Sequence, residues 1–361
     1  MPYRIFNFNP GPATLPLEVL EEAREEMLNY RNTGLSIMEM SHRSPEFEEI
    51  IDSAQSLFLE LAELSTAYQV LFLQGGASLQ FSMIPFNFLT SDTTADYIIT
   101  GSFAKKAMQE AAKIGNTNVA ASNDVTNYTT IPRPEDITLS PNSAYLHFTT
   151  NNTIYGTQWN YVPDSGTVPL IADMSSDILS RKIEMHRFAL VYAGAQKNLG
   201  PAGVTAVIIH KSLLEKASAS LPAMLSYKTH AENGSLFNTP PCFPIYIVKL
   251  VLEWIKKKGG LSAIQETNEQ KADLLYQAID NSGGYYIGHA AKEDRSIMNV
   301  TFRLPEEGLE KTFLEEAAAE GLKGLKGHRS VGGIRASIYN AMPYEGCEAL
   351  AQFMKEFPKK H

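Results

Sequence analysis

Residues 189–210 read ALVYAGAQKNLGPAGVTAVIIH and carry the strongest evidence for the fold class. Two apolar runs, 189–192 and 203–210, flank a loop of small residues that holds Lys197. Short apolar runs rich in β-branched residues are typical of strands buried on both faces of a sheet. Further runs of this kind occur at 69–74, 97–100, 144–149 and 168–172.

Stretches with helical spacing of apolar residues surround and separate these runs. The spacing predicts amphipathic helices at 17–30 and 45–64, and helices at 103–114 and 245–254. Strands that alternate with helices favour a mainly parallel sheet covered on both faces. The sequence therefore predicts an α/β fold.

A lysine and glycine run at 256–260, KKKGG, breaks this pattern and marks a predicted domain boundary. Beyond it, helices and strands are mixed, which predicts a smaller α+β domain. Its expected helices are 261–281, 309–320 and 344–357, and its expected strands are 297–302 and 334–337. We predict an N-terminal segment at 1–15, a large domain at 16–258 and a small C-terminal domain at 259–361.

Composition is that of an ordinary globular protein. The 361 residues correspond to about two domains, and 44% hydrophobic with 20% charged residues disfavours disorder. Forty acidic against 31 basic side chains give a net charge of −9, the wrong sign for a general nucleic-acid binder. We expect no nucleic-acid partner.

Cysteine usage and hydropathy indicate the compartment. Cys242 and Cys347 are too few for a disulfide framework or a thiolate zinc site, which favours a reducing compartment and no metal. The amino terminus lacks an apolar signal-like run, and no stretch of about 18 apolar residues occurs. We expect a cytoplasmic protein without a membrane partner.

Common ligand-binding signatures are missing. The chain has no G-x-G-x-x-G after a strand, no P-loop and no H-E-x-x-H, so dinucleotide, nucleotide and zinc-protease interpretations lack support. Gly76 to Ser78 begins like a nucleophile elbow, but Gln80 occupies the position of the second glycine. A serine hydrolase is disfavoured.

Lys197 and Asp173 form the most informative pair. Lys197 follows an apolar run among small residues, where it is either an exposed loop lysine or a desolvated amine able to form a Schiff base. Asp173 follows the preceding apolar run and is either a turn residue or an acid that pairs with a pyridinium nitrogen. Pyridoxal phosphate requires both groups, so the two signals support each other.

Two further features fit such a cofactor. Residues 75–78, GGAS, lie between a strand and a helix, and form either a plain tight turn or a phosphate site at a helix N-terminus. Phe103 is either a core aromatic or a ring that stacks on a planar cofactor.

Basic side chains gather in two segments predicted as loops. His42 and Arg43 lie in one, and His328, Arg329 and Arg335 lie in a glycine-rich segment. Individually they are explained by surface ion pairs, but together they suggest recognition of an anionic substrate by bidentate guanidinium groups.

These residues resemble the phosphoserine aminotransferase family of class V aminotransferases, which are pyridoxal-phosphate enzymes of the aspartate-aminotransferase fold (fold type I). The matching blocks are NFNPGPA at 7–13, SHR at 41–43, GGAS at 75–78, Asp173, GAQKN at 194–198 and HRSVGGIRAS at 328–337. Together, in this order, they cover nearly the whole chain.

The resemblance implies a role for each matching residue. Lys197 would carry the cofactor as a Schiff base, and Asp173 would pair with its ring nitrogen. Thr153 would touch the cofactor, and Ala77, Ser78 and Gln196 would help to hold its phosphate. Phe103 stands where many family members stack a tryptophan on the ring. Asn238 and Thr239 would reach the cofactor phosphate of the neighbouring subunit in a homodimer. Arg335 would bind the α-carboxylate of the substrate. The phosphate or carboxylate at the other end of the substrate would be bound by His42, Arg43, His328 and Arg329.

The implied reaction converts L-glutamate and 3-phosphohydroxypyruvate into 2-oxoglutarate and O-phospho-L-serine, for L-serine biosynthesis. Two other class V activities remain open, those of alanine–glyoxylate aminotransferases and of cysteine desulfurases. A third alternative is a protein that keeps the fold and binds ligands without catalysis, although the presence of both Lys197 and Asp173 argues against it.

Overall fold

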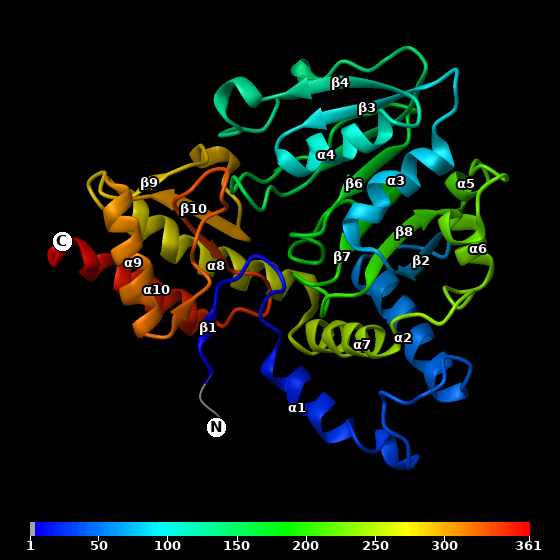
Figure 1. The fold of residues 1–361 in the computed structure, drawn as a ribbon, viewed down its shortest axis with the longest axis horizontal. Helices are drawn as coiled ribbons and strands as arrows, with labels where there is room; N and C mark the ends of the chain where they lie inside the picture. The colour runs from blue at the N-terminus through cyan, green and yellow to red at the C-terminus, as the bar shows by residue number, and fades with distance from the viewer. Residues whose placement is uncertain (1–3) are drawn as a thin grey trace.

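A seven-stranded sheet forms the centre of the larger part of the computed structural model, which describes residues 4–361 (Figure 1). Its strand order is β2-β8-β7-β6-β5-β3-β4, and only β8 runs antiparallel to its neighbours. The strands are β2 (Tyr68–Leu73), β3 (Thr94–Ile99), β4 (Asn116–Ser122), β5 (Ser143–Thr149), β6 (Leu170–Asp173), β7 (Leu190–Gly194) and β8 (Thr205–His210). The predicted α/β class with a mainly parallel sheet is confirmed.

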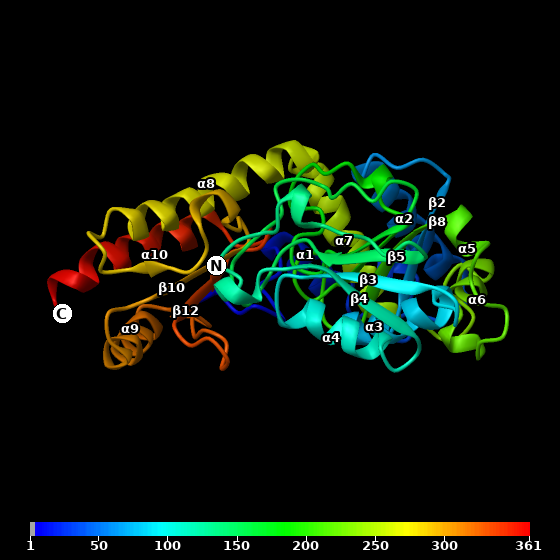
Figure 2. The same ribbon diagram turned by 90° about the horizontal axis from the view of Figure 1, so that it is seen from above.

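Helices cover both faces of this sheet, as Figure 2 shows in side view. They are α1 (Leu17–Glu26), α2 (Pro45–Leu61), α3 (Gly76–Phe88), α4 (Ser102–Ala111), α5 (Lys211–Leu214), α6 (Tyr227–Glu232) and α7 (Cys242–Lys257). Because successive strand residues point to opposite faces, Phe72 and Ile208 pack with α2 and α7, whereas Leu71 and Val207 pack with α3 and α4.

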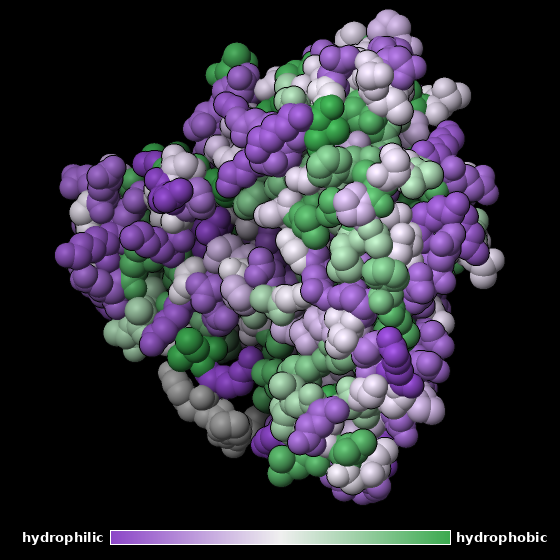
Figure 3. All heavy atoms as spheres, turned by 45° about the vertical axis from the view of Figure 1, so that its right-hand side comes forward, coloured by the Kyte–Doolittle hydropathy of each residue, from purple (hydrophilic) through white to green (hydrophobic). Residues whose placement is uncertain are grey.

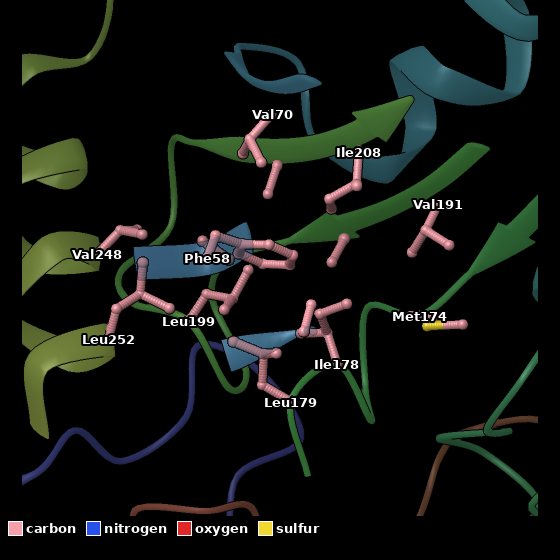
Figure 4. Close-up of a cluster of buried hydrophobic side chains, with 14 of the residues drawn as sticks. Phe58, Val70, Met174, Ile178, Leu179, Val191, Leu199, Ile208, Val248 and Leu252 are labelled. Carbon is pink, nitrogen blue, oxygen red and sulfur yellow. The ribbon is translucent and has the colours of Figure 1, made fainter. Parts of the chain in front are cut away.

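The face beneath α2 and α7 holds the larger core. Phe58 of α2 and Val248 of α7 meet Val70 and Ile208 of the sheet there, and all four are at most 1% exposed. Figure 4 shows these side chains pointing toward one another from helix and strand. Packing of this density makes the sheet a rigid base for the loops at its edge.

Local sequence explains where two important helices begin. Ser44 caps α2 by accepting the Phe47 N–H, and Pro45 occupies the first helical turn, where its missing N–H costs no hydrogen bond. Gly75 precedes α3 with φ of +87°, and a Cβ there would lie 2.6 Å from the Leu79 side chain. Only glycine allows this sharp strand-to-helix turn.

The C-terminal part is a second α and β layer. A sheet of order β12-β10-β9 is built from antiparallel pairs, and β1 pairs in parallel with β11. Its elements are α8 (Gly260–Asp280), β9 (Ile287–Gly288), β10 (Asn299–Arg303), α9 (Glu307–Ala319), β11 (Leu322–Lys323), β12 (Ile334–Ser337) and α10 (Tyr344–Glu356), with β1 at Phe6–Asn7. A separate apolar cluster around Leu275, Phe302 and Phe313 forms its core.

The predicted helices and strands are found, with three differences. The helix expected at 17–30 ends at Glu26, because Asn29 accepts the Gly34 N–H and turns the chain. β4 was not predicted, since its sequence NTNVAAS lacks an apolar run. The short elements β1, β9, β11, α5 and α6 were also not predicted.

The division into 1–15, 16–258 and 259–361 remains a prediction. Gly259 adopts a left-handed conformation between α7 and α8, which suits a boundary there. Phe8 packs in the C-terminal core, so the N-terminal segment joins that part. Residues 1–3 of this segment lie outside the described residues. Within residues 4–361, no helix is both long and apolar enough to cross a bilayer.

Phe58→Ala should destabilise the protein by about 3–5 kcal/mol, because the lost ring leaves a cavity in the large core. A lowered melting temperature in differential scanning calorimetry would report this loss. Val125→Ala, at a side chain that is 91% exposed, is the matched control and should leave the melting temperature unchanged. Equal melting temperatures for both variants would contradict the assignment of this core.

Candidate active site

A cavity of about 220 Å³ lies where the parallel strands end, the edge at which open α/β sheets place ligands. Its walls come from the β2–α3 turn, from α4, and from the loops after β5, β6 and β7. The predicted site residues that line it are Ala77, Ser78, Phe103, Thr153, Asp173, Gln196 and Lys197. The fold thus brings together side chains from widely separated parts of the sequence.

Lys197 lies in the turn after β7 and is a buried amine, not an exposed loop lysine. Burial lowers the pKa of Lys197 from 10.5 to about 8, against a smaller opposing effect of Asp173. The Nζ atom donates a hydrogen bond to Thr153 Oγ1 at 2.8 Å. An amine with this pKa is about half neutral near pH 8, far more than an ordinary lysine, and its neutral form can act as a nucleophile or base.

Asp173 ends β6 and is only 5% exposed. Its Oδ1 accepts the Ser175 N–H at 2.9 Å, and among residues 4–361 no cationic side chain lies within ion-pair distance. Burial raises the pKa of Asp173, while the Ser175 hydrogen bonds and the charge of Lys197 oppose this effect. A buried carboxylate without a paired cation is suited to a protonated nitrogen of a ligand.

The start of α3 provides an anion site. Ala77 and Ser78 lie in its first turn, where backbone N–H groups have no partner within the helix. No acidic residue occupies this turn, so the positive end of the helix dipole is uncompensated. Gln196 lines the cavity beside this turn. The arrangement can bind a phosphate group.

Phe103, in the first turn of α4, presents its ring to the cavity instead of the core. The side chain is 36% exposed, and Lys197 Nζ lies 5.7 Å from the ring centroid. A ring so placed can cover one face of a planar molecule bound to the lysine.

Arg335 of β12 approaches the cavity from the C-terminal part. Its side chain is buried, and Nη1 donates to the Thr153 carbonyl at 3.2 Å, whereas Nε has no partner. Burial lowers the pKa of Arg335, and its charge in turn contributes to the lowered pKa of Lys197. A buried guanidinium without a carboxylate partner in residues 4–361 is poised to receive an anionic ligand.

His328 and Arg329 lie near Arg335. Burial lowers the pKa of His328, and the charges of Arg335, Arg329 and Lys106 lower it further. His328 Nδ1 accepts the Ser330 N–H at 3.2 Å, which leaves Nε2 to carry the proton and donate to a ligand.

Seven predicted site residues do not line the cavity itself. Arg335 reaches its wall only through the Thr153 carbonyl, and His328 and Arg329 lie near Arg335. The other four lie elsewhere in the chain. His42 and Arg43 lie before α2, and Nε2 of His42 is buried without a partner. Asn238 and Thr239 lie behind the β2–α3 turn, where the Thr239 carbonyl accepts a hydrogen bond from the Gln74 side chain at 3.2 Å. Their roles stay predictions.

Sequence reasoning missed several polar residues in the cavity wall. Thr149 ends β5 in register with Asp173, and its buried Oγ1 has no partner. Asn151, Ser175 and Ser176 also line the cavity. The position of Thr149 at the end of an apolar run was an available signal. Across residues 4–361 no cluster of His, Cys, Asp or Glu suits a metal ion.

Comparison with known proteins identifies the family. The model of a family described as aminotransferase class-V matches residues 5–350. The chain belongs to the class V aminotransferases. A curated relative of this class V enzyme is the phosphoserine aminotransferase of Lysinibacillus sphaericus (strain C3-41), which is 56% identical over 361 residues and 100% of both chains.

Solved structures are similar to this class V aminotransferase over its full length. A phosphoserine aminotransferase from Bacillus circulans subsp. alkalophilus superposes with a TM-score of 0.98 at 56% identity, covering 99% of both chains. A phosphoserine aminotransferase with bound pyridoxal phosphate from Trichomonas vaginalis gives 0.93 at 40% identity, covering 98% of this chain and 100% of the other. The fold and the family of the chain are therefore shown to be those of pyridoxal-phosphate-dependent transaminases of fold type I.

The cavity of this class V aminotransferase fits pyridoxal phosphate on its own chemistry. Lys197 supplies an amine of lowered pKa, Asp173 a buried anion without a cation, and the α3 N-terminus an anion site. The unpartnered Thr149 hydroxyl is a further polar group that a ligand can satisfy. These are the groups that an aldehyde, a ring nitrogen and a phosphate require.

Pyridoxal phosphate added to the cofactor-free protein should react with Lys197 faster as the pH rises through about 8. Only the neutral amine attacks the aldehyde, so the rate should level off above that pH. Stopped-flow absorbance measured from roughly pH 6 to pH 10 tests this prediction. Borohydride reduction followed by mass spectrometry should place the label on residue 197. A rate that keeps rising to pH 10 would contradict a lowered pKa.

Proposed function

We propose that this class V aminotransferase exchanges the amino group between L-glutamate and 3-phosphohydroxypyruvate. The products are 2-oxoglutarate and O-phospho-L-serine, and the reaction serves L-serine biosynthesis. Full-length relatives named phosphoserine aminotransferase, with 53–56% identity, support this function.

One structural observation carries the choice of substrate class. Within residues 4–361, Arg335, Arg329 and His328 have no carboxylate within ion-pair distance, although the protein has a net charge of −9. Acidic side chains are therefore available but kept away from this side of the cavity. Two unpaired guanidinium groups, with the Nε2–H of His328 as a further donor, fit a substrate with two anionic ends.

Pyridoxal phosphate, when bound, supplies the electron sink for breaking the bond between the substrate Cα and its hydrogen. Lys197 is placed to take up this proton as a base. It can return a proton as an acid when the second substrate receives the amino group. Its pKa of about 8 suits both directions, because a group that titrates near the working pH acts as base and acid.

Other residues orient the reacting groups. Asp173 would hold a proton on the ring nitrogen of the cofactor, and Phe103 would cover one face of its ring. The first turn of α3, with Ala77 and Ser78, would hold the phosphate together with Gln196. Thr153 keeps the Lys197 amine in place through the hydrogen bond of 2.8 Å.

Both substrates would occupy the same pocket in turn. Arg335 would bind the α-carboxylate that glutamate and the keto acid share. His328 and Arg329 would receive the distal group, which is a carboxylate in one substrate and a phosphate in the other. One cationic cluster accepts either anion, which gives a physical reason for alternating use of a single site.

We further propose a homodimer with shared active sites. Among residues 4–361, Asn238, Thr239, His42 and Arg43 neither line the cavity nor hydrogen-bond to a residue that does, whereas Arg335 bonds to Thr153 of its wall; a second copy would let these four reach the cavity of the partner. Exposed apolar side chains near these residues support an interface: Leu35 and Met38 precede His42, and Phe237 precedes Asn238. Patches of apolar side chains lie open on the face drawn in Figure 3.

The cysteine desulfurase alternative requires a reactive thiolate. Burial raises the pKa of Cys347 to about 12, and burial also raises the pKa of Cys242. Neither residue lines the cavity. Thiols of raised pKa are poor nucleophiles, so this alternative has little support. Both cysteines are free, in keeping with the expected reducing, cytoplasmic setting.

Purified enzyme should transaminate phosphoserine with 2-oxoglutarate and show little activity with alanine or cysteine as amino donor. Lys197→Ala should abolish turnover, because the amine that moves the proton is gone. Asp173→Asn should retain the cofactor but lower kcat about 100-fold or more. Glutamate formation measured by a coupled assay distinguishes these cases. Preference for alanine or cysteine over phosphoserine would refute the proposed function.

Mixing two inactive variants tests the shared site. Lys197→Ala and Arg43→Ala homodimers should each have greatly reduced activity, since each lacks a group in both sites. After subunit exchange, about a quarter of the wild-type activity should return, because half of the dimers are hybrids with one intact site. Light scattering should give the mass of a dimer. No recovery after verified exchange would place Arg43 in the site of its own chain.

A further inference from the structure

Lys106, a cation beside the cavity, has no role in the proposed binding of cofactor or substrates. Lys106 lies in α4, one helical turn after Phe103, so both side chains share a face of the helix. Its Nζ lies 5.5 Å from the centroid of the Phe103 ring, and Lys197 Nζ lies 5.7 Å from the same centroid. Lys106 therefore stands over the ring that borders the reacting amine.

Lys106 also acts on the cluster that is proposed to receive the distal group. Its charge lowers the pKa of His328, together with those of Arg335 and Arg329 and with burial. The ammonium group is thus close enough to contribute to the electrostatic potential at the His328 imidazole. α4 and the loop before β12 supply this potential from two different parts of the chain.

No acidic group neutralises Lys106. Among residues 4–361 no carboxylate lies within ion-pair distance of it, and the first turn of α4 contains no acidic residue. Glu110, one turn further along the helix, is instead paired with Lys113 at 2.7 Å. On a protein with a net charge of −9, an exposed lysine commonly has an acidic side chain nearby. The absence of one beside Lys106 leaves its positive charge available to an anionic ligand.

We infer that Lys106 is a specificity-determining residue that strengthens binding of the phosphorylated substrate more than binding of the dicarboxylic one. This inference rests on the proposed function. A phosphate monoester carries about −1.5 to −2 charges near pH 7, whereas a carboxylate carries one. Because Coulomb energy scales with charge, one nearby cation favours the phosphate by up to twice as much in free energy.

The expected contribution of Lys106 to substrate binding is electrostatic and needs no direct contact with the substrate. Lys106 is exposed, so salt screens its effect on a ligand more strongly than the effect of the buried Arg335. The competing explanation is that Lys106 only holds the Phe103 ring through a cation–π contact. In that case its removal would affect both substrates equally and would not depend on salt.

Lys106→Gln should raise the KM for glutamate about twofold and that for phosphoserine up to about fourfold at low ionic strength, because a doubled charge doubles the free-energy change and so squares the ratio of KM values. The change should fall on KM rather than on kcat. Lys105→Gln is the matched control, since Lys105 is also exposed, has no ion-pair partner in the described chain and lies next in sequence. It should leave both constants unchanged, and Lys106→Arg should keep the phosphoserine preference.

Two further measurements separate charge from packing. In about 1 M salt the difference between Lys106→Gln and wild type should largely disappear, because the screening length falls to about 3 Å. The His328 imidazole, followed by NMR in cofactor-free protein with labelled histidine and assigned with His328→Asn, should have a higher pKa in Lys106→Gln. Lys105→Gln should leave that pKa nearer its wild-type value.

Equal increases of both KM values, or a phosphoserine effect that persists in high salt, would overturn the inference and leave only the cation–π contact. An unchanged His328 pKa in Lys106→Gln would overturn it as well. A wild-type enzyme that does not use phosphoserine would refute the proposed function instead. The NMR comparison needs no turnover, so it still decides whether Lys106 acts on the cluster.

Discussion

Burial of one amine and one carboxylate at the ends of neighbouring strands is the constraint on which the site depends. Lys197 and Asp173 lose the hydration that normally keeps them charged, so the pKa of the lysine falls and that of the aspartate rises. No direct ion pair joins them. The amine is therefore free to react with an aldehyde, and the carboxylate lacks a cationic partner. A cofactor with an aldehyde and a protonated ring nitrogen can satisfy both groups. The rigid sheet beneath them keeps the two groups at a constant separation.

A second layer of electrostatics surrounds this pair. Arg335 is buried without an acidic partner, and His328 keeps its proton on Nε2 because Nδ1 accepts a backbone N–H. Leaving cations unpaired costs stability, and an anionic substrate can offset that cost only when it binds. The class V family match and the full-length relatives agree with this chemistry. The site is thus cationic for recognition, and its reacting amine loses its proton more readily than an ordinary lysine.

Much of the fold was predictable because its strands are buried on both faces. The apolar runs at β5, β6, β7 and β8 are recognisable without knowing their partners, since strands covered by helices on both faces are mostly apolar. β4 escaped prediction for the opposite reason. It lies at the edge of the sheet, where polar side chains are tolerated, and its order comes from pairing with β3. The residues of β4 alone do not predict this pairing, because it depends on contacts with another strand.

By itself, the sequence determined the α/β class and the chemical identities of Lys197 and Asp173, because residue type and position after an apolar run are local properties. It also contained the blocks that mark the family. Only the tertiary structure decided that Lys197 is buried and that Arg335, on a distant strand, donates to Thr153 in the wall of the same cavity. It also decided that the Lys106 ammonium lies over the Phe103 ring. Burial and distance arise from contacts between segments far apart in the chain, and no spacing within one segment encodes them.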